Sequence, residues 1–224
     1  MKIAFRVDSS SHFGLGHVSR CITLAKEFKL KGCKVIFICK EIDDTSKIIL
    51  KNNNILLVKI NKYLSNIQDG LTTNKIIKKN KINIIFLDSY VLGLSWEKIV
   101  SQECKIAWID DYYKRESVAD FYINYHSFLY GKKLNKLKKN CKKLIGLEYL
   151  ILKKKPKKIF RKRQVFCYFG SVDSKSLTEK LINTLKKNNK LKFKYNIFVT
   201  KNFNSNFHLN KKKVNIITTF KKNI

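Results

Sequence analysis

The sequence predicts an α/β fold built from two Rossmann-like, doubly wound parallel-sheet halves, and three patterns along its 224 residues support this. Short apolar runs alternate with longer amphipathic segments, which is typical of buried parallel strands connected by helices. The alternation stops in a basic stretch around Pro156, the only proline, and then begins again. The second half is shorter than the first, so we expect its sheet to be incomplete.

Five apolar runs in the first half are predicted strands: Ile3–Val7, Val35–Cys39, Ile55–Ile60, Ile84–Leu87 and Ile106–Ile109. The segment between the first two is a predicted helix, because Val18, Cys21, Ile22 and Ala25 follow the i, i+3, i+4, i+7 spacing of one helix face. Gly32 offers a stop for this helix.

Capping side chains precede two further amphipathic segments of the first half. Asp43 or Asp44 is expected to cap the helix after the second strand, and Ser95 the helix that carries Trp96 and Ile99. These caps complete the strand–helix alternation of the first half.

The strand–helix pattern of the second half is shorter. We predict strands over Val165–Phe169, Tyr195–Thr200 and Val214–Ile217, and a helix from Ser174 to about Lys187. The chain is therefore expected to contain a first domain over residues 1–152, a basic linker over 153–164 and a partial second domain over 165–224.

The net charge of +32 has a make-up that argues against a nucleic-acid partner. Lysines account for 43 of the 48 basic residues, and lysine, asparagine and isoleucine together account for 91 of the 224 residues. All three have codons built from A and T alone, so an A/T-rich genome explains the composition. Nucleic-acid interfaces favour arginine instead, although a polyanion-binding role stays open as an alternative.

Several other classes of protein are disfavoured. No apolar run approaches the roughly 20 residues that span a bilayer, and Asp8 interrupts the N-terminus before a signal-peptide core could form. The six cysteines show neither a C-x-x-C pair nor zinc-like spacing, which indicates free thiols in the cytoplasm. We expect no metal and no cofactor, and we favour a monomer.

The segment from Asp8 to Arg20 contains the residues most suited to chemistry. It lies between the first strand and the first helix, where α/β proteins bind phosphate-bearing ligands. Gly14 and Gly16 would allow a close approach of backbone and ligand. A dinucleotide fingerprint is disfavoured, because Ser19 stands at its third glycine position and no acidic residue ends the second strand.

His17 would occupy the first turn of the predicted helix. The positive end of the helix dipole disfavours an imidazolium there, so a neutral ring could act as a general base on water. A capping or ligand-contacting histidine without a catalytic role is the alternative.

The segment FRVDSSSHFGLGHVSRCITLA closely resembles the start of the PseG family, UDP-2,4-diacetamido-2,4,6-trideoxy-altropyranose hydrolases of pseudaminic acid synthesis. The later segments FLDSY, WIDD, YINYH, GLEYLIL and FGSVD extend the resemblance over nearly the whole chain. It implies the GT-B arrangement of two Rossmann-like halves also found in MurG-type glycosyltransferases. It also implies hydrolysis of a UDP-linked sugar at its anomeric carbon, which releases UDP and the free sugar with inversion.

The resemblance assigns the water-activating histidine to His17. The candidate substrate-binding residues are Asp8, Gly14, Gly16, Asp88, Tyr90, Asp110, Asp111, Asn124, Gly170 and Ser171. Tyr90 would bind the sugar or the water, Asp110 and Asp111 would bind sugar hydroxyls or orient His17, and Asn124 would reach an N-acetyl group. Structural roles are the alternative for these two acids and for Asn124.

The second half departs from the pattern of the family. Ser171 replaces the second glycine of a strand-end turn, and Lys153 stands where the family tends to carry arginine. This half is also shorter than the resemblance implies, so we expect a truncated form that lacks the later loops for uracil, ribose and diphosphate and that binds and hydrolyses a UDP-sugar weakly. Two alternatives remain: a related surface-polysaccharide (spore-coat type) nucleotide-sugar enzyme, and an inactive remnant that binds carbohydrate or polyanion.

Overall fold

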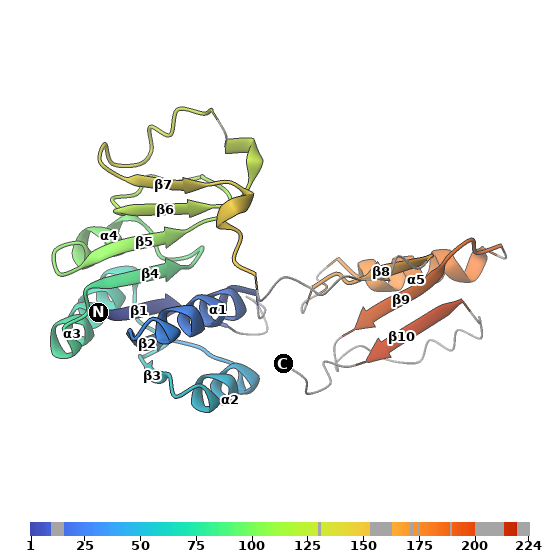
Figure 1. Cartoon of the computed structure of the whole chain (residues 1–224), viewed down its shortest axis with the longest axis horizontal. Coiled ribbons are helices and arrows are strands. Elements are labelled where there is room, and N and C mark those ends of the chain that lie inside the picture. Colours follow the sequence, from blue (N-terminus) through green and yellow to red (C-terminus); the bar gives the residue numbers. More distant parts are fainter. Residues whose placement is uncertain are drawn as a thin grey trace. The chain divides into compact units, whose positions relative to one another are not determined.

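The computed structural model describes residues 1–9, 16–129, 131–152, 163–170, 173, 175–188, 190–199 and 213–218 of the chain. The chain divides into two compact units, Met1–Lys154 and Lys155–Ile224. Each unit contains its own parallel sheet (Figure 1). The α/β class and the two Rossmann-like halves predicted from the sequence are confirmed.

Seven parallel strands form the sheet of the first unit, in the order β3-β2-β1-β4-β5-β6-β7. Their bounds are β1 (Lys2–Val7), β2 (Lys34–Cys39), β3 (Leu56–Lys59), β4 (Ile84–Asp88), β5 (Lys105–Ile109), β6 (Phe121–Asn124) and β7 (Lys142–Ile145). The chain runs outward from β1 to β3 and then crosses to β4 on the other side of β1 (Figure 1). This reversal opens a crevice beyond the carboxyl ends of β1 and β4, where α/β sheets bind their ligands.

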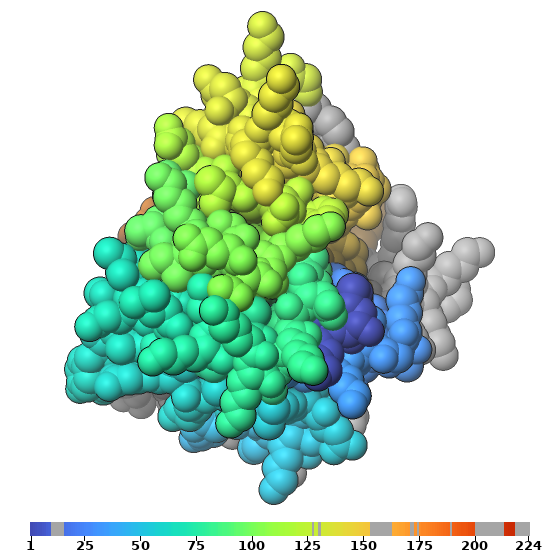
Figure 2. Space-filling model, turned by 90° about the vertical axis from the view of Figure 1, so that its left-hand side faces the viewer, coloured from blue at the N-terminus to red at the C-terminus, as the bar shows by residue number. Residues whose placement is uncertain are grey.

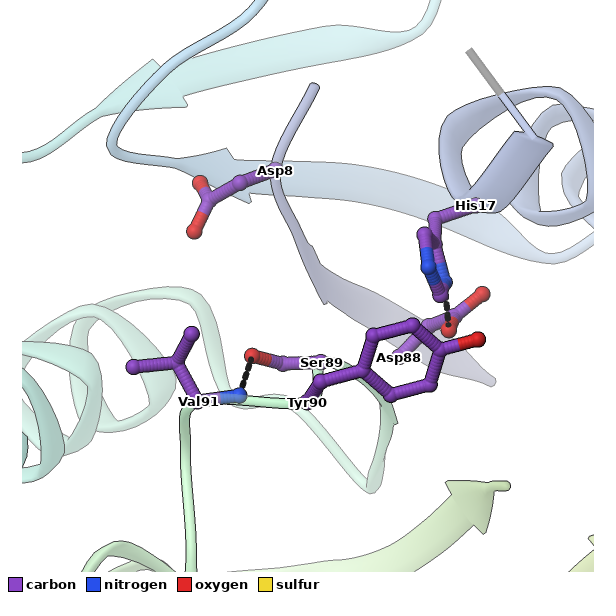
Figure 3. Close-up of a pocket in the computed structure, with 6 residues that line it drawn as sticks. All are labelled: Asp8, His17, Asp88, Ser89, Tyr90 and Val91. Carbon is purple, nitrogen blue, oxygen red and sulfur yellow. Dashed lines mark hydrogen bonds and ion pairs between the residues drawn. The ribbon is translucent and has the colours of Figure 1, made fainter. Parts of the chain in front are cut away.

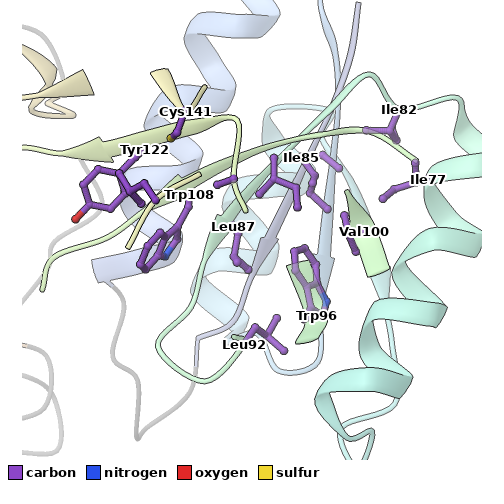
Figure 4. Close-up of a cluster of buried hydrophobic side chains, with 14 of the residues drawn as sticks. Ile77, Ile82, Ile85, Leu87, Leu92, Trp96, Val100, Trp108, Tyr122 and Cys141 are labelled. Carbon is purple, nitrogen blue, oxygen red and sulfur yellow. The ribbon is translucent and has the colours of Figure 1, made fainter. Parts of the chain in front are cut away.

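Helices cover both faces of this sheet, because successive strand residues point to opposite sides. The helices are α1 (Gly16–Leu30), α2 (Asp44–Asn52), α3 (Asn66–Asn80) and α4 (Leu94–Val100), with 3-10 turns η1 (Ser127–Leu129) and η2 (Leu147–Tyr149). Phe5 and its face of the sheet pack against α1 and α2. Ala4 lies on the other face, which packs against α3 and α4 around the fully buried Trp96 (Figure 4).

Figure 2 shows the end of the first unit that lies opposite the crevice, viewed from the amino-terminal ends of its strands. The teal-to-green residues at its centre belong to α3, α4 and the turns that lead into β4 and β5, and the yellow residues above lead into β7. This end of the sheet lies away from the crevice.

The predicted first helix is confirmed. The residues of its apolar face, Val18, Cys21, Ile22 and Ala25, are all buried. Gly32 follows the helix with a φ of +77°, the left-handed conformation that favours glycine.

One of the two predicted helix caps is confirmed and the other is wrong. Asp43 caps α2 and accepts a hydrogen bond of 2.8 Å from the Ser46 N–H. Ser95 does not cap α4, because the helix already begins at Leu94 and Gly93 is the N-cap. Ser95 therefore lies inside the first turn.

The sequence analysis missed β6, β7 and α3 for physical reasons. Strand β6 has only four residues, and β7 is a half-exposed edge strand with Lys142 and Lys143 in it, so neither forms a long apolar run. The buried positions of α3 include Asp69, Gly70 and Thr73, which break the apolar periodicity of a core-facing helix.

The second unit has three parallel strands in the order β10-β9-β8: β8 (Gln164–Cys167), β9 (Lys194–Val199) and β10 (Val214–Thr218). Helix α5 (Leu177–Lys187) packs Ile182 and Leu185 into the small core of this unit. The helix begins at Leu177, three residues later than predicted. Asp173, which precedes the helix, accepts hydrogen bonds from the N–H groups of Leu177 and Thr178 in its first turn. Of the predicted linker, residues 153–162 lie outside the described part of the chain.

Candidate active site

Two adjoining pockets lie at the carboxyl ends of the first unit's strands. One is an open pocket of about 270 Å³ (Figure 3), and the other of about 680 Å³. His17 and Tyr90 line both. The smaller pocket is also lined by Asp8, Asp88, Ser89 and Val91, and the larger by Gly16, Arg20, Asp111, Tyr125, Leu150 and Ile151.

His17 is held in one orientation and one tautomer. It is the second residue of α1, and its Nδ1 lies 2.5 Å from Asp88 Oδ1 at the end of β4. The Tyr90 ring meets the imidazole edge-on, with the ring centroids 4.5 Å apart (Figure 3). Because an ionised carboxylate can only accept hydrogen bonds, Nδ1 carries a hydrogen and donates a hydrogen bond to Asp88. In the neutral imidazole, the lone pair of Nε2 is then left for a ligand or water.

Asp88 is ionised although its side chain is fully buried. Burial alone would raise the pKa of Asp88, but hydrogen bonds from Arg20 and His17 and the charge of Arg20 outweigh it and hold the pKa below its ordinary value.

The acceptor capacity of Asp88 is taken up by protein groups. Oδ1 accepts from His17 Nδ1 at 2.5 Å and from Arg20 Nη2 at 2.6 Å, and Oδ2 accepts from Arg20 Nε at 2.6 Å and from the Cys21 thiol at 3.5 Å. A carboxylate has about four such sites. In this geometry Asp88 holds His17 in place, and the substrate contact expected of Asp88 from the sequence stays a prediction.

Arg20 joins Asp88 to a second carboxylate, Asp111. Its Nη1 and Nη2 donate to Asp111 at 2.8 Å and 3.1 Å. Asp111 also accepts from the Tyr90 hydroxyl. Burial would raise the pKa of Asp111, but the hydrogen bonds from Arg20 and Tyr90 hold it below its ordinary value. Burial and the bond to Asp111 raise the pKa of Tyr90, so its phenol keeps the proton.

Asp8 lies directly after β1 and faces the smaller pocket (Figure 3). Its Oδ1 accepts from the Lys40 and Glu41 N–H groups at 2.6 Å and 3.3 Å, and from Arg6 Nη1 at 2.8 Å. Arg6 is itself fully buried and forms a two-bond pair with Asp69 of α3 at 3.1 Å and 2.7 Å. The pocket edge at Asp8 is thus anchored to the core.

Two expected site residues do not line either pocket. Asp110 accepts from the Tyr113 N–H at 2.6 Å and from the Tyr122 hydroxyl at 2.8 Å. Asn124 is fully buried, donates to the Tyr122 hydroxyl and accepts from the His126 N–H. Both groups serve the packing at the ends of β5 and β6.

The remaining expected residues divide by location. Gly16 lines the larger pocket, whereas Gly14 and Ser171 lie outside the described residues. Gly170 belongs to the second unit and has a φ of +93°, which a residue with a side chain would rarely adopt.

Four residues of the larger pocket were not among the candidates from the sequence: Arg20, Tyr125, Leu150 and Ile151. A signal existed for Arg20, because residues three apart share one face of a helix and His17 stands three positions before it. The other three belong to the segments YINYH and GLEYLIL, but only as members of a resemblance.

Within the described residues, no group of three or more His, Cys, Asp or Glu side chains is placed to hold a metal ion. The described helices include none with the length and apolar character to cross a membrane.

No family model matches the chain. The chain is 25% identical, over an alignment of 195 residues that covers 84% of the chain, to the UDP-2,4-diacetamido-2,4,6-trideoxy-beta-L-altropyranose hydrolase of Campylobacter jejuni. It spans 66% of the length of that relative. The resemblance indicated by the sequence motifs is confirmed by this similarity.

Two solved structures share the fold. MurG of Acinetobacter baumannii has a TM-score of 0.58 and 15% identity, with 98% of this chain and 68% of that chain covered. A glycosyltransferase from Rickettsia africae has a TM-score of 0.60 and 13% identity, with 97% and 68% covered. The two Rossmann-like halves are thus similar in fold to those of GT-B glycosyltransferases.

Proposed function

We propose that the chain is a nucleotide-sugar hydrolase that cleaves a UDP-linked sugar at its anomeric carbon, with His17 as the general base. The observation that carries the proposal is the pair formed by His17 Nδ1 and Asp88 Oδ1, 2.5 Å apart, at the sheet position where α/β proteins bind ligands. The similarity to the Campylobacter jejuni hydrolase and the GT-B fold support a substrate of the UDP-sugar class.

In the proposed reaction, a water molecule gives one proton to Nε2 of His17 while its oxygen attacks the anomeric carbon. The bond between that carbon and the diphosphate oxygen breaks, and its electron pair leaves with UDP. A single displacement of this kind inverts the anomeric centre. Asp88 stabilises the imidazolium that forms, because its carboxylate faces the protonated Nδ1.

The larger pocket suits a sugar that carries both polar and methyl groups. Tyr90, Tyr125 and Asp111 offer hydrogen-bonding groups there, and Leu150 and Ile151 offer an apolar wall. We therefore propose a diacetamido-trideoxy sugar, the class named for the Campylobacter jejuni relative. Asp8 and Gly16 would bind the sugar or its diphosphate.

The test of the base is His17→Asn in the whole chain, with UDP release from the UDP-sugar as the assay. We expect kcat to fall by about 10²–10⁴-fold, the usual contribution of a general base, while the affinity for UDP stays the same. His126→Asn is the matched control, since His126 lines neither pocket. If His17→Asn kept most of its turnover, His17 would be a ligand contact without catalysis.

The bond that breaks is tested in ¹⁸O-labelled water. Attack at the anomeric carbon places the label on the released sugar. Label found on the UDP phosphate would mean attack at phosphorus and would overturn the role proposed for His17.

A further inference from the structure

The guanidinium of Arg20 has five N–H donors in a rigid plane, and the site offers each of them an acceptor. Nε and Nη2 donate to the two oxygens of Asp88, both at 2.6 Å. Nη1 and Nη2 donate to the two oxygens of Asp111 at 2.8 Å and 3.1 Å. The second N–H of Nη1 has the Tyr125 hydroxyl at 3.4 Å.

Because all five N–H groups of Arg20 already have acceptors within the protein, Arg20 differs from an arginine that binds phosphate. An arginine that grips a diphosphate must direct at least one fork of N–H groups to the ligand. The forks of Arg20 are directed at Asp88 and Asp111, and its side chain is only 13% exposed. A diphosphate would have to displace a buried carboxylate to reach it.

Each of the two carboxylates that Arg20 binds also orients one hydrogen-bonding side chain of the pocket. Asp88 accepts from Nδ1 of His17, so Nε2 keeps its lone pair. Asp111 accepts from the hydroxyl of Tyr90, so the phenol oxygen keeps its remaining lone pair as an acceptor. His17 and Tyr90 form the wall shared by both pockets.

We infer that Arg20 is a positioning residue that fixes His17 and Tyr90 together as two hydrogen-bond acceptors for one attacking water, of which only His17 takes a proton in the reaction. This inference rests on the proposed hydrolysis and adds to it the group that sets the geometry of the base. A water that donates one hydrogen bond to each acceptor presents its own lone pair to the anomeric carbon. Arg20 lines the larger pocket, but its donors are directed at Asp88 and Asp111, and it acts on the reaction through these two carboxylates.

The planar fork of the guanidinium is essential to this role. A lysine ammonium keeps the charge but is a point donor that cannot bind two carboxylates in a bidentate manner. Arg20→Lys therefore releases at least one of Asp88 and Asp111 and, with it, the orientation of His17 or Tyr90.

The experiment compares Arg20→Lys and Arg20→Met with the unchanged chain. For Arg20→Lys we expect kcat for UDP release to fall by about 10²-fold, as for a misplaced catalytic group, with the calorimetric affinity for UDP unchanged. Arg115→Met is the matched control, because Arg115 pairs with Glu97 and not with the carboxylates of the site. A tenfold or larger loss of UDP affinity in Arg20→Lys would identify Arg20 as a phosphate ligand and overturn the inference.

The pH profile of kcat/KM distinguishes the two roles of Arg20, because loss of a purely structural arginine would leave the apparent pKa of the profile unchanged. The charged and titratable groups around His17 are Arg20, Asp88, Tyr90, Asp8 and, through Arg20, Asp111. Arg20→Met removes the positive charge 3.1 Å from Nδ1 and leaves the two carboxylates, which favours the imidazolium. We expect the acid limb of the profile to move to higher pH. An unmoved limb would contradict the inference.

Nitrogen-15 NMR of the histidine rings tests the inference independently of hydrolysis. In the unchanged chain we expect the Nδ1–H tautomer of His17, and in Arg20→Met a mixture of tautomers; His17→Asn identifies the signal. If the unchanged chain hydrolysed no UDP-sugar, the proposed function would fail, while this spectrum would still decide the role of Arg20. Should Arg20→Met not fold, Arg20→Lys decides, and an unchanged pure Nδ1–H tautomer there together with an unchanged kcat would refute the role.

Discussion

Asp88→Asn removes one negative charge from the site and changes the size of the side chain least. The amide has one accepting oxygen where the carboxylate has two, and its NH₂ group is a donor. In any orientation it meets either Arg20 or His17 with a donor where the native side chain accepts. An amide that donates to Nδ1 forces the proton onto Nε2, and His17 then has no lone pair for water.

The expected loss follows from this wrong tautomer and from the missing countercharge to the imidazolium. We expect kcat to fall by about 10³–10⁴-fold, which corresponds to about 4–5.5 kcal/mol of transition-state stabilisation. Stability should fall by about 1–3 kcal/mol, because Arg20 loses a buried charged acceptor but keeps Asp111.

The assay is UDP release under saturating UDP-sugar, together with urea unfolding of the same samples. Asp120→Asn is the matched control, since Asp120 pairs with Lys138 and accepts from the Ile106 N–H, away from both pockets. A folded Asp88→Asn variant that kept kcat within about fivefold would refute the assignment of the tautomer to Asp88.

Two further predictions concern stability. Hydrogen bonds from Arg20 and Arg6 outweigh burial and hold the pKa values of Asp88 and Asp69 below the ordinary range; the unfolded chain therefore binds more protons, and urea unfolding from pH 7 to pH 2 should show stability falling below about pH 4. A free energy of unfolding that did not change between pH 7 and pH 2 would contradict the ionised state of Asp88 and Asp69. Trp96→Ala should cost about 3–5 kcal/mol in the same assay, because Trp96 is fully buried and its Nε1 donates to Asp69 at 2.8 Å; a loss under about 1 kcal/mol would contradict its place in the core.

Local patterns in the sequence were sufficient for the fold class and the position of the catalytic candidate. Apolar runs of strand length identified β1, β2, β4 and β5, and the spacing of Val18, Cys21, Ile22 and Ala25 identified α1. These features depend on backbone periodicity and burial within a few residues, which neighbouring residues specify. The place of His17, just after the first strand, follows from the same local order.

Contacts between distant residues were decided only by the tertiary structure. His17 and Asp88 are 71 positions apart, and Arg20 and Asp111 are 91 apart. Parallel strands bring these residues together because their carboxyl ends meet at one edge of the sheet. The sequence analysis listed the acids but could not assign Asp88 rather than Asp110 or Asp111 to the imidazole.

The contrast between Asp110 and Asp111 shows why. They are adjacent at the end of β5, yet Asp110 bonds to Tyr122 and Asp111 bonds to Arg20. Which of two neighbouring side chains turns toward the pocket depends on the direction of the strand end and on the partners across the sheet. Strand β7 could not be predicted from the sequence for a similar reason, since its pairing with β6 depends on backbone hydrogen bonds and not on an apolar run. Side-chain type and spacing therefore determined which groups were available, and the register of the sheet determined which of them meet.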